Sequence, residues 1–133
     1  MIKKKYNENY FEKIDTEDRA YFLGFICADG CILNNENKHR YQVNLKLHVK
    51  DEHILNTLIN CIDGEMEIWH HNQREVSEVK FSGKKIINDL SNLGILPNKT
   101  FNLKYPSIPY ELERHFLRGY FDGDGCIRIN KDK

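Results

Sequence analysis

The chain has 133 residues, of which 40% are hydrophobic and 30% charged, a composition typical of a folded globular domain and unlike that of a wholly disordered chain. Its 20 basic and 20 acidic side chains cancel, so it lacks the basic excess usual in proteins that bind nucleic acids. No apolar run approaches the roughly 20 residues of a membrane helix, and the lysine-rich N-terminus has no apolar segment after it, so we expect a cytoplasmic protein without a membrane partner.

The first part of the chain predicts a helix, a hairpin and a second helix. Asp15 or Thr16 can cap a helix whose apolar positions continue to a stop at Gly30. A short strand over 31–34 leads through a polar loop to a long strand over 40–50, where polar and apolar side chains alternate. The apolar face of that strand comprises Tyr41, Val43, Leu45, Leu47 and Val49. Asp51 is expected to cap the next helix, which carries an apolar stripe over 54–62.

The next elements are a second hairpin and a third helix. Segments 65–71 and 76–82 predict two strands joined by a turn at 72–74, and the helix after them ends at Gly94. Residues 95–111 contain all three prolines and separate this unit from the C-terminal part of the chain. Pro109 suits the first turn of a new helix, and Cys126–Ile129 predict the start of a strand.

The element order is therefore α-β-β-α-β-β-α, followed by α-β. We predict an α/β fold of the α+β type with an antiparallel sheet, comprising a first unit over 1–105 and an incomplete second unit over 106–133. The four cysteines have no metal-binding spacing and are expected to be buried: Cys27, Cys31, Cys61 and Cys126. His70 and His71 point to opposite faces of a strand and are not expected to chelate a metal together.

One segment of the chain is written twice, as "YFLGFICADGCI" at 21–32 and as "FLRGYFDGDGCI" at 116–127. Each copy reads as a helix with a central glycine, Gly24 or Gly119, and an aspartate, Asp29 or Asp124, near its end. A glycine inside a helix costs roughly 1 kcal/mol relative to alanine, and close approach of another backbone is the usual compensation. We therefore expect the two helices to pack through their glycines and to bring the two aspartates together.

Two carboxylates held close together repel each other unless a cation neutralises them. Oxygen ligands with room for water and phosphate suit Mg²⁺, and such sites hold the attacking and leaving oxygens of a phosphodiester. The alternative is purely structural, with two Asp-Gly turns that end two helices. The repetition of the apolar spacing, the glycine and the ending favours the metal site.

Residues 22–30 and 117–125 resemble the LAGLIDADG motif of homing endonucleases, and the element order resembles that fold over the whole chain. The resemblance implies a site-specific endonuclease that hydrolyses double-stranded DNA with Mg²⁺ or Mn²⁺. It implies that Asp29 and Asp124 bind the catalytic metal, helped by the carbonyls of Ala28 and Gly123. It also implies that saddle-shaped sheets lie in the major groove and that the strands are cut across the minor groove.

The chain departs from the family pattern in two respects. The sixth motif position, commonly acidic, is Cys27 in the first copy and Asp122 in the second, so the two halves of the site need not be equivalent. Most of a second α-β-β-α-β-β-α unit is also missing, and half of the DNA-reading surface with it. We therefore expect the chain to be an impaired or inactive part of such an enzyme.

The polar face of the 40–50 strand is the predicted DNA-reading surface, with Arg40, Gln42, Asn44, Lys46 and His48. No acid lies within 38–50, although an ordinary solvated strand face would show the same alternation. The resemblance further suggests Lys80 as a lysine near the scissile phosphate. Many surface strands carry a lysine, so this role rests on the resemblance.

Two other functions stay open at this point. Some intron maturases and transcription regulators resemble the same fold and bind nucleic acid without cutting it. The chain could also be an inert remnant, with Leu112, Phe116 and Tyr120 exposed or covered by self-association. The target sequence and the host element, whether intron, intein or free-standing gene, are left open.

Overall fold

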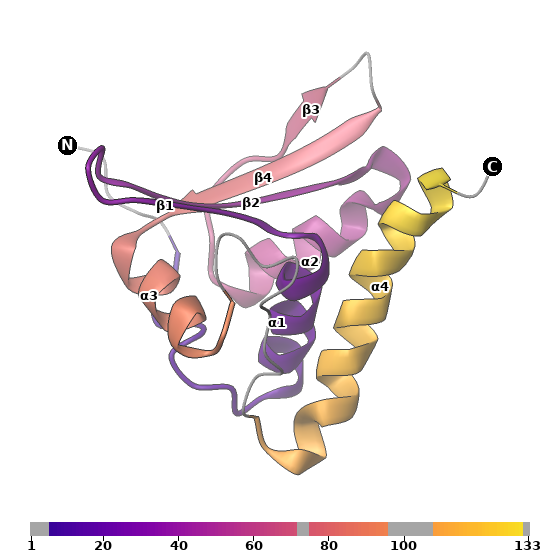
Figure 1. The fold of residues 1–133 in the computed structure, drawn as a ribbon. Coiled ribbons are helices and arrows are strands. Elements are labelled where there is room, and N and C mark those ends of the chain that lie inside the picture. Colours follow the sequence, from indigo (N-terminus) through magenta and orange to yellow (C-terminus); the bar gives the residue numbers. More distant parts are fainter. Residues whose placement is uncertain (1–5, 72–74, 96–107, 132–133) are drawn as a thin grey trace.

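The computed structural model describes residues 6–71, 75–95 and 108–131, with side chains as far as Asp124 in the last helix. One antiparallel four-stranded sheet, ordered β1-β2-β4-β3, is covered on one face by helices (Figure 1). The elements are α1 (Glu17–Asp29), β1 (Cys31–Asn35), β2 (Arg40–His48), α2 (Glu52–Cys61), β3 (Trp69–His71), β4 (Val76–Ser82), α3 (Lys84–Asn92) and α4 (Glu113–Lys131). This α-β-β-α-β-β-α order confirms the predicted fold class.

Helix α1 lies at the centre of the molecule, between the sheet and α4 (Figure 1). The Thr16 side chain accepts a hydrogen bond from the Arg19 N–H and caps its first turn, so Thr16 is the cap of the two candidates in the sequence. The helix ends at Asp29, after which Gly30 is extended and donates its N–H to the Ile26 carbonyl at 2.8 Å. Residues 20–27 are all buried, because this helix is covered on more than one side.

Strand β2 is one of the two inner strands of the described sheet and pairs with β1 and β4. Its inner face carries Val43, Leu45 and Leu47, which are at most 2% exposed, so the predicted alternation is correct over this stretch. Val49 departs from it, because the strand ends at His48 and Val49 enters a short 3-10 turn, where it is 41% exposed. Asp51 occupies the N-cap position of α2 but makes no side-chain capping bond.

The segment before α1 belongs to the hydrophobic core, which the sequence analysis did not predict. Tyr10, Phe11 and Ile14 are buried in this core. The Tyr10 hydroxyl donates a short hydrogen bond to Asp18 in the first turn of α1. Nearer the N-terminus, the Tyr6 hydroxyl donates to the Ser82 carbonyl at 2.6 Å, which ties the segment to the end of β4.

Two expectations about local structure need correction, and a third is confirmed. The first strand of the second hairpin is shorter than predicted, and its turn at 72–74 lies outside the described residues. Cys27 is buried as expected, whereas Cys31 is exposed on an edge strand. Gly94 ends α3 as predicted, with φ of 98° in the left-handed region that glycine tolerates.

The largest difference concerns residues 126–129, which were expected to begin a strand. They lie inside α4, which continues through Asp124 and Gly125 to Lys131. A strand needs a neighbouring strand to receive its backbone hydrogen bonds. In the described sheet β1 is an edge strand that pairs only with β2, so residues 126–129 have no strand partner there. A helix satisfies the same backbone groups internally. None of the described helices has the length and apolar character required to cross a membrane.

Candidate metal centre and nucleic-acid interface

Helices α1 and α4 approach each other at their glycines. A Cβ atom at Gly24 would overlap the carbonyl oxygen of Phe116, and one at Gly119 would overlap the carbonyl oxygen of Tyr21. Both obstacles are backbone atoms of the opposite helix, which cannot move aside as a flexible side chain could. At these two points only glycine permits the observed separation.

The same packing brings the two motif aspartates to one end of the helix pair. A Cβ at Gly123 would lie 3.1 Å from the Ala28 Cβ and 3.5 Å from the Asp29 Cβ. Gly123, the residue immediately before Asp124, therefore lies close to Asp29. Both aspartates are partly buried at this end.

The surrounding groups are compatible with a divalent cation. The donor set offers two carboxylates, and no cluster of three or more His, Cys, Asp or Glu side chains suited to a metal occurs in the described part of the chain. The remaining ligands would be backbone carbonyls, water and phosphate oxygens, a combination that suits Mg²⁺. The Ala28 carbonyl lies in the last turn of α1, where intrahelical partners are lacking. Gly123 lies within α4, where carbonyls normally accept from the next turn.

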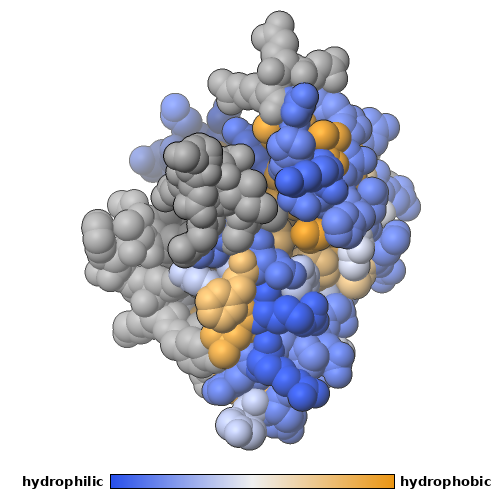
Figure 2. Space-filling view, turned by 90° about the vertical axis from the view of Figure 1, so that its right-hand side faces the viewer, coloured by the Kyte–Doolittle hydropathy of each residue, from blue (hydrophilic) through white to orange (hydrophobic). Residues whose placement is uncertain are grey.

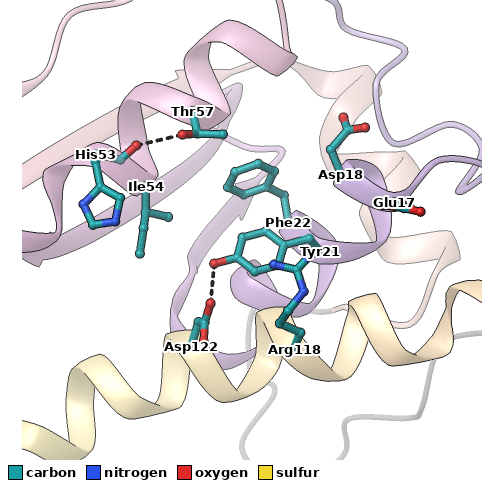
Figure 3. Close-up of a pocket in the computed structure, with 9 residues that line it drawn as sticks. All are labelled: Glu17, Asp18, Tyr21, Phe22, His53, Ile54, Thr57, Arg118 and Asp122. Carbon is teal, nitrogen blue, oxygen red and sulfur yellow. Dashed lines mark hydrogen bonds between the residues drawn. The ribbon is translucent and has the colours of Figure 1, made fainter.

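The two copies of the motif differ at the sixth position. Cys27 is 3% exposed and packs in the core. Its counterpart Asp122 is exposed and accepts a hydrogen bond of 2.6 Å from the Tyr21 hydroxyl across the helix pair. The Arg118 guanidinium lies 4.4 Å from the centre of the Tyr21 ring. These contacts line an open pocket of about 440 Å³ between α1, α2 and α4 (Figure 3).

The outer face of the sheet carries the predicted DNA-reading residues: Arg40, Gln42, Asn44, Lys46 and His48. In the antiparallel register Asn44 lies opposite Lys80, and Lys46 lies opposite Glu78. Glu78 is 3% exposed and its carboxylate is 2.8 Å from the His71 ring nitrogen. This face therefore includes an acid, contributed by the neighbouring strand, which the composition of 38–50 alone did not reveal.

Lys80 is held in place by an aromatic side chain that the sequence analysis did not single out. Its ammonium group lies 5.0 Å from the centre of the Trp69 ring. Trp69 is 59% exposed and pairs with Glu78 in the sheet. The single tryptophan among polar residues of this strand could have indicated an exposed functional side chain, because a tryptophan with a purely structural role is normally buried.

The neighbouring histidines bind different carboxylates. The His70 ring nitrogen lies 2.7 Å from Glu52, which also accepts a hydrogen bond from Ser77 at 2.7 Å. These two bonds lower the pKa of the Glu52 carboxyl. His70 and His71 thus point to separate partners, and they do not form a joint metal site.

The exposed apolar residues of α4 differ from those expected. Phe116 is 3% exposed, and Leu112 and Tyr120 are partly buried against the core. Leu117 and Phe121 are exposed instead, by 41% and 67%. When the motif copies are superposed in sequence, these two match Phe22 and Ile26, which are fully buried in the core. Figure 2 shows apolar areas within a hydrophilic surface on the side where α4 lies.

Comparisons with known proteins concern the C-terminal motif and the fold. Residues 111–133 match the family described as LAGLIDADG-like domain. The fold resembles the I-LtrWI LAGLIDADG homing endonuclease bound to target DNA, with a TM-score of 0.50, 15% identity, and coverage of 88% of this chain and 58% of that one. A variant of I-DmoI in complex with its nicked target DNA in the presence of manganese gives a TM-score of 0.45 at 17% identity, covering 88% and 62% of the two chains.

A relative in sequence is the "Probable translation initiation factor IF-2" of Methanocaldococcus jannaschii, 29% identical over 121 residues. The match covers 85% of this chain but only 9% of that protein, so the name of the whole protein assigns nothing to this segment. The chain also spans less than two thirds of the two endonuclease chains. At its C-terminal end the chain carries a LAGLIDADG-like sequence, and its fold is that of the LAGLIDADG homing endonucleases.

Proposed function

We propose that this chain is part of a divalent-metal-dependent, site-specific endonuclease that hydrolyses double-stranded DNA. The observation that supports it most is the glycine contact between α1 and α4, which gathers Asp29 and Asp124 at one end of the helix pair. That end adjoins the start of β1, whose first residue, Cys31, pairs with Asn44 on the polar face of β2. A pair of carboxylates thus lies next to a surface suited to DNA.

The residues in this proposal have distinct roles. The carboxylates of Asp29 and Asp124, with the carbonyls of Ala28 and Gly123, would hold Mg²⁺ or Mn²⁺. When bound, the cation would stabilise the charge that develops on the phosphate oxygens during hydrolysis. Lys80 would lie near the scissile phosphate, with Trp69 restricting the positions of its ammonium group.

The outer face of the sheet would enter the major groove. Arg40 and Lys46 suit guanine or phosphate, Gln42 and Asn44 suit adenine, and His48 can accept or donate. The Glu78 carboxylate opposite Lys46 is buried and bonded to His71, so it is not among the base-reading groups. The chain would therefore read one half of a longer site, with the other half read by a second unit or a second copy of the chain.

A second candidate function is a nucleic-acid-binding protein that does not cut. One specific observation favours it: the two aspartates occupy different positions in their helices. Asp29 ends its helix, whereas Asp124 lies within a helix that continues to Lys131. A cation site that needs two helix ends would then be only half formed.

Cation binding by the whole chain tests the proposed centre without requiring cleavage. Mn²⁺ binding, followed by electron paramagnetic resonance, should weaken at least tenfold in Asp29→Asn and in Asp124→Asn. Asp122→Asn is the matched control, since that carboxylate lies on the same helix but is bonded to Tyr21. Undiminished Mn²⁺ binding in both motif variants would contradict the centre.

Cleavage separates the two candidate functions. The endonuclease proposal expects a full-length version, with a complete second α-β-β-α-β-β-α unit, to nick a plasmid carrying its site in Mg²⁺ but not in EDTA. It expects the Asp29→Asn variant of that version to bind DNA without nicking. Duplex binding that is insensitive to EDTA, with no nicking in Mg²⁺ or Mn²⁺, would favour the non-catalytic binder.

A further inference from the structure

A basic pocket lies on the outer side of the sheet, where β2 begins and β4 ends. It is open and holds about 450 Å³, and its lining combines four basic side chains with neutral groups: His39, Arg40, Tyr41, Gln42, Lys80, Ser82, Gly83 and Lys84. None of these described lining residues is acidic. The first turn of α3, which comes directly after Gly83, also carries no acid.

The walls of the pocket are fixed by contacts that leave its cations un-neutralised. Gln42 and Ser82 lie opposite each other across β2 and β4, so neutral hydrogen-bonding side chains form the floor. The Gly83 N–H donates to the Tyr41 carbonyl at 2.9 Å, which holds the start of α3 against β2. The Lys84 ammonium lies 5.8 Å from the centre of the Tyr41 ring.

Lys85, the residue after Lys84, is paired with carboxylates, whereas the cations of the pocket have no such partner in the part of the chain that the structure describes. Lys85 lies 2.7 Å from Asp89 and 3.8 Å from Glu12, and the bond to Asp89 raises its pKa. Among the described residues, neither Arg40 nor Lys84 has a carboxylate within ion-pair distance. Cations that share a pocket without an acid repel one another, and a phosphate group relieves that repulsion while accepting their hydrogen bonds.

We propose that this pocket binds one phosphate of the DNA backbone, with Arg40 and Lys84 as its charged ligands. The inference rests on the proposed function, because it takes the outer face of the sheet as the DNA-binding face. It assigns Arg40 to backbone contact, which positions the duplex, and leaves Gln42 and Asn44 for base readout. Lys80 borders the pocket on the side nearer to Trp69.

The register of the sheet places this pocket further along β2 than the residues that adjoin the first motif. Asn44 pairs with Cys31, which lies two residues after Asp29, and Arg40 lies four residues before Asn44. At about 3.4 Å per residue along a strand, the pocket lies about 14 Å along β2 from the Cys31–Asn44 pair. Since duplex DNA rises about 3.4 Å per base pair, a duplex that follows β2 would place the bound phosphate about four base pairs from the point where it meets that pair.

The salt dependence of duplex binding tests the pocket. The dissociation constant of the whole chain for a mixed-sequence duplex is measured by fluorescence anisotropy over a range of salt concentrations. Replacing both Arg40 and Lys84 by alanine should reduce the slope of log Kd against log salt by about 0.9, the value for one phosphate contact. Lys84→Ala and Arg40→Ala should each reduce the slope by part of that amount. Lys85→Ala removes the same charge from the next position and should leave the slope unchanged. Unchanged slopes for Lys84→Ala and Arg40→Ala, with duplex binding intact, would overturn the proposal.

A second measurement distinguishes failure of the pocket from failure of the proposed function. Inorganic phosphate is titrated into the ¹⁵N-labelled chain, and the amide signals of Gly83 and Lys84 should shift in the wild type but not in Lys84→Ala. Such shifts in a chain that binds no duplex would support the pocket and overturn the DNA-binding function. The absence of shifts in the wild type would overturn the pocket even if DNA binds elsewhere.

Discussion

Two physical arguments predict opposite effects of Gly119→Ala on the stability of the fold. Helix propensity alone predicts that the substitution stabilises α4 by about 1 kcal/mol. The structure predicts destabilisation, because the new Cβ would overlap the Tyr21 carbonyl oxygen and lie 2.8 Å from the Tyr21 carbonyl carbon and 3.1 Å from the Phe25 nitrogen. Ordinary contacts of a Cβ begin near 3.4 Å, so the two backbones must separate.

The size of the decrease in the free energy of unfolding depends on how far the new Cβ overlaps the opposite backbone. Overpacking a close-packed site costs up to about 3 kcal/mol, and a separation of about 1 Å also forfeits much of the dispersion energy along the helix pair. After subtraction of the gain in helix propensity, the net loss is about 2 kcal/mol, or a fall in Tm of roughly 8 °C for a chain of this size. Gly64→Ala is the control, since its Cβ would meet the flexible end of the Met66 side chain.

Urea denaturation followed by circular dichroism measures both variants. We expect a clearly lower midpoint for Gly119→Ala at an unchanged slope, and a much smaller change for Gly64→Ala. Hydrogen exchange should place the effect in α1 and α4. A midpoint for Gly119→Ala equal to or above that of the wild type would refute the close backbone contact, and with it the geometry that gathers the two aspartates.

Three further predictions concern acid stability, the outer face and the exposed side of α4. Burial raises the pKa of the Asp18 carboxyl, but hydrogen bonds from Tyr10 and Thr16 outweigh it and leave the pKa below its usual value. A carboxyl whose pKa is lowered in the folded state stabilises the fold at pH values above its unfolded pKa. Tyr10→Phe should therefore lower the free energy of unfolding by about 1 kcal/mol at neutral pH, and the difference from wild type should shrink below about pH 4 in denaturation curves. A difference that does not depend on pH would contradict this. Trp69, the only tryptophan, is exposed on the outer face, so duplex DNA should quench the intrinsic fluorescence; saturating DNA without a spectral change would place binding elsewhere. Replacing both Leu117 and Phe121 by serine should reduce binding of an apolar dye and any self-association in sedimentation, and unchanged values would show that this face does not cause them.

The acidic position within the second motif shows how far sequence alone extends. The repeat identified Asp29, Asp124 and the two helical glycines, because the same residue types recur at the same spacing. It did not indicate that Asp122 would bond to Tyr21 of the other helix, since that pairing depends on how the two helices are rotated about each other. The same rotation decides that Phe116 is buried and Leu117 exposed, although the two are neighbours in sequence.

The sequence by itself determined the element order, the alternation of β2 and the matched pair of glycine-containing helices. These features depend on local periodicity and on short-range residue preferences, which can be recognised within a single segment of the sequence. Only the tertiary structure decided the partners across strands and helices: Glu78 opposite Lys46, Trp69 beneath Lys80, and the acid-free pocket at Arg40 and Lys84. It also decided that residues 126–129 are helical, because a strand depends on a neighbour that local sequence cannot supply.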